Sequence, residues 1–297
     1  MSSNVLVSII IPTYKNRGNL KRCIDSALNQ TYNNVEIVVV DDNNPDTPHR
    51  KATEDVLNEY SGNEKVIYIK HEHNKNGSAA RNTGWRNSHG EYVEFLDDDD
   101  LFLPEKTEKE LKYLNEHHEF DAVYSFEESE KKGILNITPY EGDVSKHILL
   151  LESRIQTSTI MFRRYALERI SGFDESFRRH QDLEVLLRFF QAGMKIGCLQ
   201  KSLVIYGANM GENAMVGKQM EELKKQFLSQ FGSYIEKYDK EEPGYANKVY
   251  AKHYAGVFLK YVKNKNFLSA IRILFCYTYK NPKIFFEVVS HSFMAHL

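Results

Sequence analysis

The sequence has few of the features that secreted proteins and nucleic-acid-binding proteins need. Its three cysteines, Cys23, Cys198 and Cys276, lie far apart and show no CxxC spacing. Because they are odd in number and widely spaced, they exclude a disulfide framework and indicate a reducing compartment. The formal net charge is -2, whereas general nucleic-acid binders are markedly basic. Nucleic acid is therefore not an expected partner.

Long apolar runs are scarce as well. The N-terminal run Val5–Ile11 stops at Pro12 and has neither a basic segment before it nor a small-residue cleavage site after it. It therefore predicts a first β-strand and not a signal peptide. Near the C-terminus, Arg272 and the segment 280–282 interrupt the apolar residues, so no stretch is expected to span a bilayer. Together these features predict a cytoplasmic protein.

The chain is long enough for one main domain with an appendage, and its beginning alternates between strand and helix patterns. Strands are predicted at Val5–Ile11, Val35–Val40 and Val66–Ile69. Between them lie two helices, with these apolar residues expected to face inward: Leu20, Cys23, Ile24, Ala27 and Leu28 in the first, and Ala52, Val56 and Leu57 in the second. This order predicts an α/β fold with a mostly parallel sheet, whose ligands bind at the carboxyl ends of the strands.

The most informative stretch is 90–104, where a short apolar strand ends in four consecutive carboxylates, Asp97 to Asp100. Neighbouring like charges resist joint ionisation, so such a cluster usually has a cation to neutralise it. Oxygen ligands suit Mg²⁺ or Mn²⁺, which bind one or two carboxylates together with substrate phosphates. The alternative is a solvated acidic loop that caps the helix after Pro104.

Other polar residues follow the strands in the same way. Thr13 and Tyr14 come after the first strand, and Asp41 and Asp42 come at the end of the second. The loop 74–84 runs into a helix whose N-terminal N–H groups favour anions. The alternative for this loop is an ordinary helix start, with Ser78 as the cap and Arg81 on the surface.

Four segments in this order resemble a family 2 glycosyltransferase of the GT-A fold. They are VSIIIPTYKNRGNLKRCIDSALNQTYNNVEIVVVDDN, NGSAARNTGW, GEYVEFLDDDD and GFDESFRRHQDLEVLLRFFQAG. The resemblance covers roughly the first two thirds of the chain. It implies a Rossmann-like sheet flanked by helices, a nucleotide-diphosphate sugar donor, a divalent metal, inversion at the anomeric carbon, and a carboxylate base near the start of a helix.

The resemblance also assigns roles to individual residues. The expected nucleotide is UDP. Pro12, Thr13 and Tyr14 match the residues under the base, and Asp42 matches the carboxylate that accepts from a uracil N–H. Gly77 and Arg81 match the loop that reaches the base or diphosphate, and Asp97 and Asp98 match the acids near the ribose. Asp99 matches the metal ligand, with Asp97 as a second one, and Asp182 matches the catalytic base. Gln181 departs from the family pattern, since many relatives carry Glu there.

The resemblance sets the expected domains. Residues 1–217 are predicted to form the GT-A catalytic domain, with a nucleotide-sugar half at about 1–104 and an acceptor half at about 105–217. The segment 204–217 is predicted to act as a lid, because it is irregular and rich in Gly, Asn and Met. Residues 218–297 are predicted to be a helical appendage.

The appendage has an unusual charge pattern, because no acidic residue lies between Pro243 and Phe286. Basic and aromatic helices of this kind suit a membrane surface with anionic lipid, so the region 243–297 is a candidate for peripheral membrane contact. The alternative is that these helices pack their aromatic faces on the catalytic domain. Nothing in the pattern indicates an oligomeric state.

The expected function is a metal-dependent inverting hexosyl- or N-acetylhexosaminyltransferase. Its donor would be a UDP-sugar, its acceptor a glycan or lipid-linked glycan, and its place cell-surface polysaccharide synthesis at the inner face of the membrane. Two alternatives stand beside it. A sugar nucleotidyltransferase should carry a Gly-rich phosphate loop after the first strand, where this chain has PTYKNRGNL. A nucleotide-sugar-binding subunit without activity would not need the acids at Asp42, Asp99 and Asp182.

Overall fold

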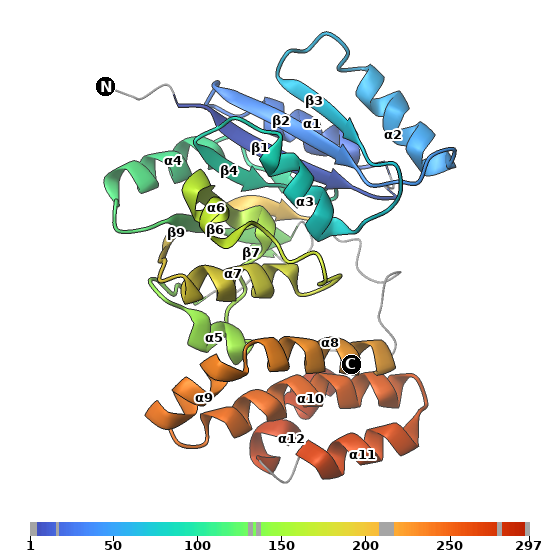
Figure 1. Ribbon diagram of the computed structural model, residues 1–297, viewed down its shortest axis with the longest axis vertical. Helices are drawn as coiled ribbons and strands as arrows, with labels where there is room; N and C mark the ends of the chain where they lie inside the picture. Colours follow the sequence, from blue (N-terminus) through green and yellow to red (C-terminus); the bar gives the residue numbers. More distant parts are fainter. Residues whose placement is uncertain are drawn as a thin grey trace. The chain divides into compact units, whose positions relative to one another are not determined.

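The computed structural model describes residues 5–15, 18–129, 133–134, 138–207, 217–277 and 281–294 (Figure 1). Of residues 291–294 it describes the backbone alone. The central part of the predicted lid, 208–216, lies outside these residues. Its beginning, 204–206, is not irregular but belongs to a strand, Ile196–Tyr206, and Val204 is in the core. The chain forms two compact units, which are Met1–Val144 with Ile155–Asn209, and Ser145–Arg154 with Met210–Leu297. The short segment Ser145–Arg154 therefore belongs with the C-terminal helices, which the sequence pattern did not indicate.

The first unit is an α/β structure. Its strands are β1 (Val7–Thr13), β2 (Val35–Asp41), β3 (Val66–Lys70), β4 (Tyr92–Phe95), β5 (Leu101–Phe102), β6 (Ala122–Ser129), β7 (Gly133–Ile134), β8 (Ile160–Arg163) and β9 (Ile196–Tyr206). Its helices are α1 (Leu20–Leu28), α2 (Pro48–Asn58), α3 (Gly77–Arg86), α4 (Lys106–Glu116), α6 (Arg164–Ile170) and α7 (Gln181–Gln191), and a 3₁₀ turn covers Thr157–Thr159.

Within the described residues the strands form one sheet in the order β3-β2-β1-β4-β8-β6-β9-β5, with β7 paired to β6. The first four strands in this order are parallel, and β8 then runs antiparallel between β4 and β6. The parallel part places the ends of β1, β2 and β4 at one edge. The predicted α/β fold of the GT-A kind, with C-terminal helices, is confirmed.

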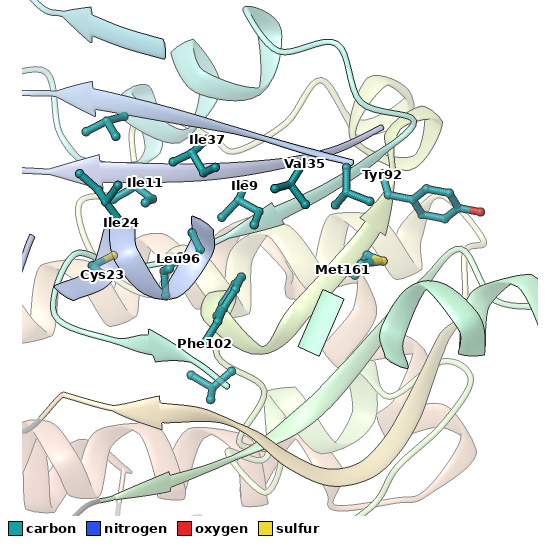
Figure 2. Close-up of a cluster of buried hydrophobic side chains, with 14 of the residues drawn as sticks. Ile9, Ile11, Cys23, Ile24, Val35, Ile37, Tyr92, Leu96, Phe102 and Met161 are labelled. Atoms are coloured by element: carbon teal, nitrogen blue, oxygen red, sulfur yellow. The ribbon is translucent and has the colours of Figure 1, made fainter. Parts of the chain in front are cut away.

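The two faces of the parallel strands are covered by different helices. Alternate residues of β1 and β2, including Ile9, Ile11 and Ile37, share a buried cluster with Cys23 and Ile24 of α1, as Figure 2 shows. The residues between them face α3, where Gly84 lies so close that an added Cβ would meet Cγ2 of Ile10 at 2.2 Å. Since successive side chains of a strand point to opposite faces, one continuous apolar run serves both helices.

Two details of the predicted elements are wrong. β1 does not end before Pro12 but continues through it to Thr13, since Pro12 pairs in register with Val40. In α2, Ala52 is exposed, and the helix buries Arg50 and Thr53 instead. The periodicity of apolar residues could not reveal this, because Arg50 is buried by contacts with polar partners and not by apolar packing.

Helix α4 also differs from its pattern, which is that of a charged surface helix. Lys106 and Glu110 are fully buried, and the Lys106 Nζ lies 2.7 Å from both Glu110 Oε2 and Glu94 Oε1 of β4. Thr107 donates to the second Glu94 oxygen at 2.7 Å. Burial raises the pKa of Glu110 to about 8, which favours the neutral form of this carboxyl in the cluster.

The second unit is helical. It contains α5 (Ser145–Leu149), α8 (Gly217–Gln230), α9 (Gly232–Glu241), α10 (Tyr245–Lys263), α11 (Phe267–Tyr277) and α12 (Pro282–Met294). α10 supplies Ala251 and Ala255 to a buried cluster with Phe285 of α12. The segment with α5 is held by polar contacts, since His253 bonds the Leu149 carbonyl at 2.9 Å and Tyr245 donates to the Lys146 carbonyl at 2.7 Å. Among the described helices, none has the length and hydropathy needed to cross a bilayer.

The buried cluster on α4 predicts a large loss of stability on substitution of Lys106. Lys106→Met leaves Glu94 and Glu110 buried without their cation, which typically costs ~3–5 kcal/mol. Urea unfolding should show this loss as a lower midpoint. Lys109→Met is the matched control, because Lys109 pairs with Glu105 at the surface of the same helix, and it should leave the midpoint nearly unchanged. Equal midpoints for both variants would contradict the assignment.

Candidate functional site

The carboxyl ends of β1, β2 and β4 bring the predicted polar residues together at one edge of the sheet. The Thr13 hydroxyl at the end of β1 donates to Asp98 Oδ2 at 2.5 Å. The Asp42 amide donates to the Thr13 carbonyl at 2.9 Å, which joins the ends of β1 and β2. The strand-end rule used on the sequence therefore placed these residues correctly side by side.

The acid loop, Asp97–Asp100, is a turn closed by a bond from the Asp100 amide to the Asp97 carbonyl at 2.9 Å. Buried Ser158 holds both ends of it, since its hydroxyl accepts from the Asp97 amide at 3.1 Å and donates to Asp100 Oδ2 at 2.7 Å. The Gly207 amide donates to Asp100 Oδ1 at 2.9 Å. Asp100 is thus a structural member of the loop, and the earlier acids are the ones left for a ligand.

The electrostatics of this loop favour a cation. Burial, with the charge of Asp97 added, raises the pKa of Asp99, and it raises that of Asp100 further. Among the residues that the structure describes, no side chain donates to Asp99, and no group of three or more His, Cys, Asp or Glu is placed to hold a metal alone. A carboxylate that is partly buried and lacks a side-chain donor suits a divalent ion that keeps waters and phosphate oxygens as its other ligands. The donor set therefore fits Mn²⁺ or Mg²⁺ at Asp99.

Asp42 holds the loop after β3. Its Oδ1 accepts from His71 Nδ1 at 2.7 Å and from the Lys75 amide at 2.8 Å. Its Oδ2 accepts from Asn74 Nδ2 at 2.7 Å and from the Asn76 amide at 3.0 Å. A carboxylate has about four acceptor positions, and all are in use. The expected contact of Asp42 with uracil stays a prediction, and it requires one of these donors to leave.

A second carboxylate, Asp41, helps to hold the loops after β2 and β3. Arg50 approaches Asp41 Oδ2 with Nε at 3.1 Å, and Tyr68 donates to that oxygen at 2.7 Å. Arg50 also donates to the carbonyls of Asn43 and His71. Burial and the bond to Asp41 raise the pKa of Tyr68 beyond its usual range, against the opposing charge of Arg50. Arg50 therefore ties the loop after β2 to the loop after β3.

Arg81 of α3 links the acid loop to the start of α7. It forms an ion pair with Asp97 and donates from Nη1 to Gln181 Oε1 at 2.5 Å. Gly77 allows this approach, because a Cβ there would lie 2.9 Å from the same Gln181 oxygen. The alternative of an ordinary helix start is wrong in both parts, since Arg81 is buried and Asn76 is the cap, accepting from the Ala79 amide at 3.2 Å. Contact of Arg81 with a base or diphosphate stays a prediction.

Helix α3 also positions the loop that leads to Asp182. Asn82 donates to the Phe173 carbonyl at 2.8 Å, Ser78 to the Phe177 carbonyl at 3.1 Å, and Asn76 to the Glu175 carbonyl at 2.8 Å. These three side chains point from one helix to one loop. Of the three, only Ser78 was singled out in the sequence, and as a helix cap, because the partners of all three lie almost a hundred residues away.

Asp182 lies in the first turn of α7, which begins at Gln181, and so it is not the N-cap. Burial raises the pKa of Asp182, against the opposing influence of nearby backbone amides and of Arg81. A carboxylate with a raised pKa is a better proton acceptor near neutral pH. Glu184 cannot take this part, because it is fully buried and bound to Arg188.

The remaining predicted donor residues lie at the end of β1. Tyr14 is 42% exposed, so its ring is accessible for stacking, and Pro12 precedes it by two residues inside the strand. His71 was missed, although it directly follows β3. The strand-end rule that singled out Asp42 would have found it. Arg50 carries no such signal, because nothing local marks a helix arginine as buried.

A family model described as Glycosyl transferase family 2 matches residues 8–187, more than half of the chain. An uncharacterized glycosyltransferase of Rickettsia prowazekii is 33% identical over 196 residues, which cover 63% of this chain and 59% of that protein. The glycosyltransferase GlyA of Streptococcus pneumoniae is 40% identical over 157 residues, covering 51% of this chain and 22% of that protein. The match thus spans less than two thirds of these relatives' own length.

A solved structure shows the same fold. The crystal structure of S. aureus TarS 1-349 in complex with UDP-GlcNAc has a TM-score of 0.62 with this chain at 17% identity. The similarity covers 93% of this chain and 92% of that one.

The bonds around Asp42 predict a structural effect that needs no ligand. In Asp42→Asn an NH₂ group replaces one carboxylate oxygen, so the two hydrogen bonds that this oxygen accepts are lost. Hydrogen bonds to a charged group are worth ~1.5–3 kcal/mol. Hydrogen exchange of the ligand-free protein should show faster exchange of the Lys75 and Asn76 amides. Asp55→Asn on the exposed face of α2 is the control. Unchanged protection of the loop in Asp42→Asn would show that Asp42 does not hold it.

Proposed function

Because the chain belongs to glycosyl transferase family 2, we propose that it transfers a sugar from a UDP-linked donor to a hydroxyl group of a glycan or lipid-linked glycan. We propose inversion at the anomeric carbon and dependence on Mn²⁺ or Mg²⁺. One observation carries the proposal. Arg81 joins the acid loop at Asp97 to the start of the helix that bears Asp182, which supports one shared site for the residues proposed to bind donor and metal and to act as base.

The donor assignment is supported by two features. S. aureus TarS, which has the same fold, was crystallised in complex with UDP-GlcNAc. In this chain, exposed Tyr14 offers a ring to a nucleobase, and aromatic stacking on a base is worth ~1–3 kcal/mol. We propose that the transferred sugar is a hexose or an N-acetylhexosamine.

Each residue of the site has a separate role in a one-step displacement at the anomeric carbon. Asp182 takes the proton of the attacking hydroxyl, and burial suits it to this task by raising its pKa. Arg81 keeps Asp97 in place, and Thr13 keeps Asp98 in place. A divalent ion held by Asp99 and Asp97 would neutralise the charge of the diphosphate leaving group. No covalent intermediate is required, so one inversion results.

The same residues give less support to the two alternatives, a sugar nucleotidyltransferase and an inactive binding subunit. A sugar nucleotidyltransferase would need phosphate-binding glycines after β1, and β1 is followed by Tyr14 and Lys15. A binding subunit without catalysis would not need a partly buried Asp182 whose charged form is disfavoured. Hydrolysis of the donor in a simple assay separates an enzyme from a binding subunit. We place the reaction in cell-surface polysaccharide or glycolipid synthesis, at the inner face of the membrane.

The charge of the acid loop predicts that metal and nucleotide bind interdependently. Titration calorimetry of UDP in the presence of chelator should give much weaker binding than with Mn²⁺, because the loop alone repels the diphosphate. Asp99→Asn should imitate the chelator and weaken binding by at least ~10- to 100-fold, the loss typical of altered metal sites. Asp55→Asn should bind like the wild type. Equal affinities with and without Mn²⁺ would exclude the metal site.

The position of Asp182 predicts a kinetic effect without a structural one. Asp182→Asn removes a disfavoured charge and preserves the shape of the side chain, so the melting temperature and UDP affinity should stay at the wild-type level. Sugar transfer should fall by ~10²- to 10⁴-fold, as is typical when a general base is lost. Wild-type transfer by a folded Asp182→Asn protein would leave His180 as the next candidate.

The pH profile gives an independent check of the same role. The base works only when ionised, so wild-type transfer should decline as the pH falls through the pKa of Asp182, which burial raises above the ordinary value of an aspartate. The residual activity of Asp182→Asn should lack this decline. An unchanged acid limb in the variant would assign the limb to another group.

A further inference from the structure

Helix α11, Phe267–Tyr277, is apolar on two sides. One side buries Ala270 and Ile273 within the second unit. The other exposes a stripe of large apolar side chains: Phe267 at 60%, Leu268 at 84%, Ile271 at 49% and Phe275 at 74%. Their spacing of about four residues places them on one face of the helix. An apolar helix face is normally covered, and within the residues that the structure describes nothing covers this stripe.

The charges around the stripe indicate what the occupant is. The one charged side chain on α11 is Arg272, which is bound to Glu221 of α8. Lys263 ends α10 and Lys265 lies in the linker just before the stripe. Within the described residues, neither of these lysines has an acidic partner, and the same holds for Lys260 and Lys283.

Other lysines of the second unit show that this is not a general property of it. Lys146 and Lys248 both pair with Glu242, and Lys252 pairs with Glu152. The charges of these three lysines are therefore neutralised by acids, and Lys237 and Lys240, which have no acidic partner among the described residues, share α9 with Glu236, Asp239 and Glu241. Around α11, in contrast, Lys260 and Lys263 have no acid on their own helix. No acidic residue lies between Pro243 and Phe286 to oppose their charge.

We propose that the exposed stripe of α11 lies in the interface of an anionic lipid bilayer, with the helix parallel to the membrane plane. The apolar side chains would enter the boundary between headgroups and acyl chains, and Lys263 and Lys265 would meet the anionic headgroups. Eleven residues of helix span about 16 Å, which is roughly half of a hydrocarbon core, so α11 lies on the bilayer and does not cross it.

A second copy of the chain is a less favourable occupant. A symmetric dimer through the stripe would place the same surface of each copy face to face. The unpaired lysines of both copies would then approach one another without an acid between them, and like charges across an interface are unfavourable. An anionic surface has the opposite sign and gains from each of these lysines.

The proposal gives a location to a membrane contact of the chain, and it does not depend on the transfer reaction. Vesicle binding and donor hydrolysis are therefore measured on the same preparations of the full chain, so that each can fail without the other. The binding assay is flotation with vesicles of phosphatidylcholine alone or with phosphatidylglycerol added, at low and at high salt. The wild type should float with the anionic vesicles, and high salt should weaken this binding.

Substitutions on the stripe test its apolar part. Leu268→Glu and Phe275→Glu should each weaken binding to anionic vesicles by about tenfold or more, because a charge replaces a large apolar side chain that would enter the bilayer. Both positions are exposed, so the melting temperature should not change. Ile134→Glu is the matched control, since Ile134 is 63% exposed but belongs to the first unit, and it should bind like the wild type.

The lysines test the electrostatic part. Lys263→Gln and Lys265→Gln should each weaken binding by about fivefold at low salt and have less effect at high salt. Wild-type protein that does not float at low salt would overturn the proposal. So would equal binding by Leu268→Glu, or sedimentation without lipid that shows a dimer which Leu268→Glu abolishes, because the stripe would then be a contact between copies.

Discussion

Four adjacent carboxylates at the end of a buried strand repel one another, and much of the first unit is arranged to keep them in place. Three of them have partners from three different parts of the chain. Asp97 binds Arg81 of α3, Asp98 binds Thr13 of β1, and Asp100 binds Ser158. Among the described residues, these partners neutralise or solvate three of the acids and leave Asp99 without a side-chain donor. Asp99 is thus the carboxylate of the loop that is most open to a cation, and the partners of its neighbours connect the loop to β1, α3 and α7.

The sequence predicted the parts of this arrangement that depend on local patterns. β-branched runs found the parallel strands, and the rule that ligands gather at strand ends brought together Thr13, Asp42 and the acid loop. Arg50 and Lys106 could not be found in this way. A buried cation is stable only because of partners distant in sequence, such as Glu94 for Lys106, and a helix pattern counts a lysine as exposed. The role of Ser158 in holding the acid loop was hidden in the same way, because its two bonds go to a loop some sixty residues earlier.

Two buried charge networks support the loops of the site. Arg50 with Asp41 fixes the loops after β2 and β3, and Lys106 with Glu94 fixes α4 to the strand that ends in the acid loop. Buried ion pairs contribute little net stability, but breaking one is costly. Their effect is on geometry, since each holds a loop of the site to a rigid element. A site made mostly of loops gains its precision from such contacts.

The membership of Ser145–Arg154 in the second unit has a consequence for how this chain can vary. The polypeptide enters the helical unit, returns to complete the sheet with β8 and β9, and then enters the helical unit again. His253 and Tyr245 bond the backbone of that early segment. A single recombination event near residue 217 would therefore not exchange the helical unit as a module. The two units are expected to be inherited together, and a homologue with different C-terminal helices should also differ at 145–154.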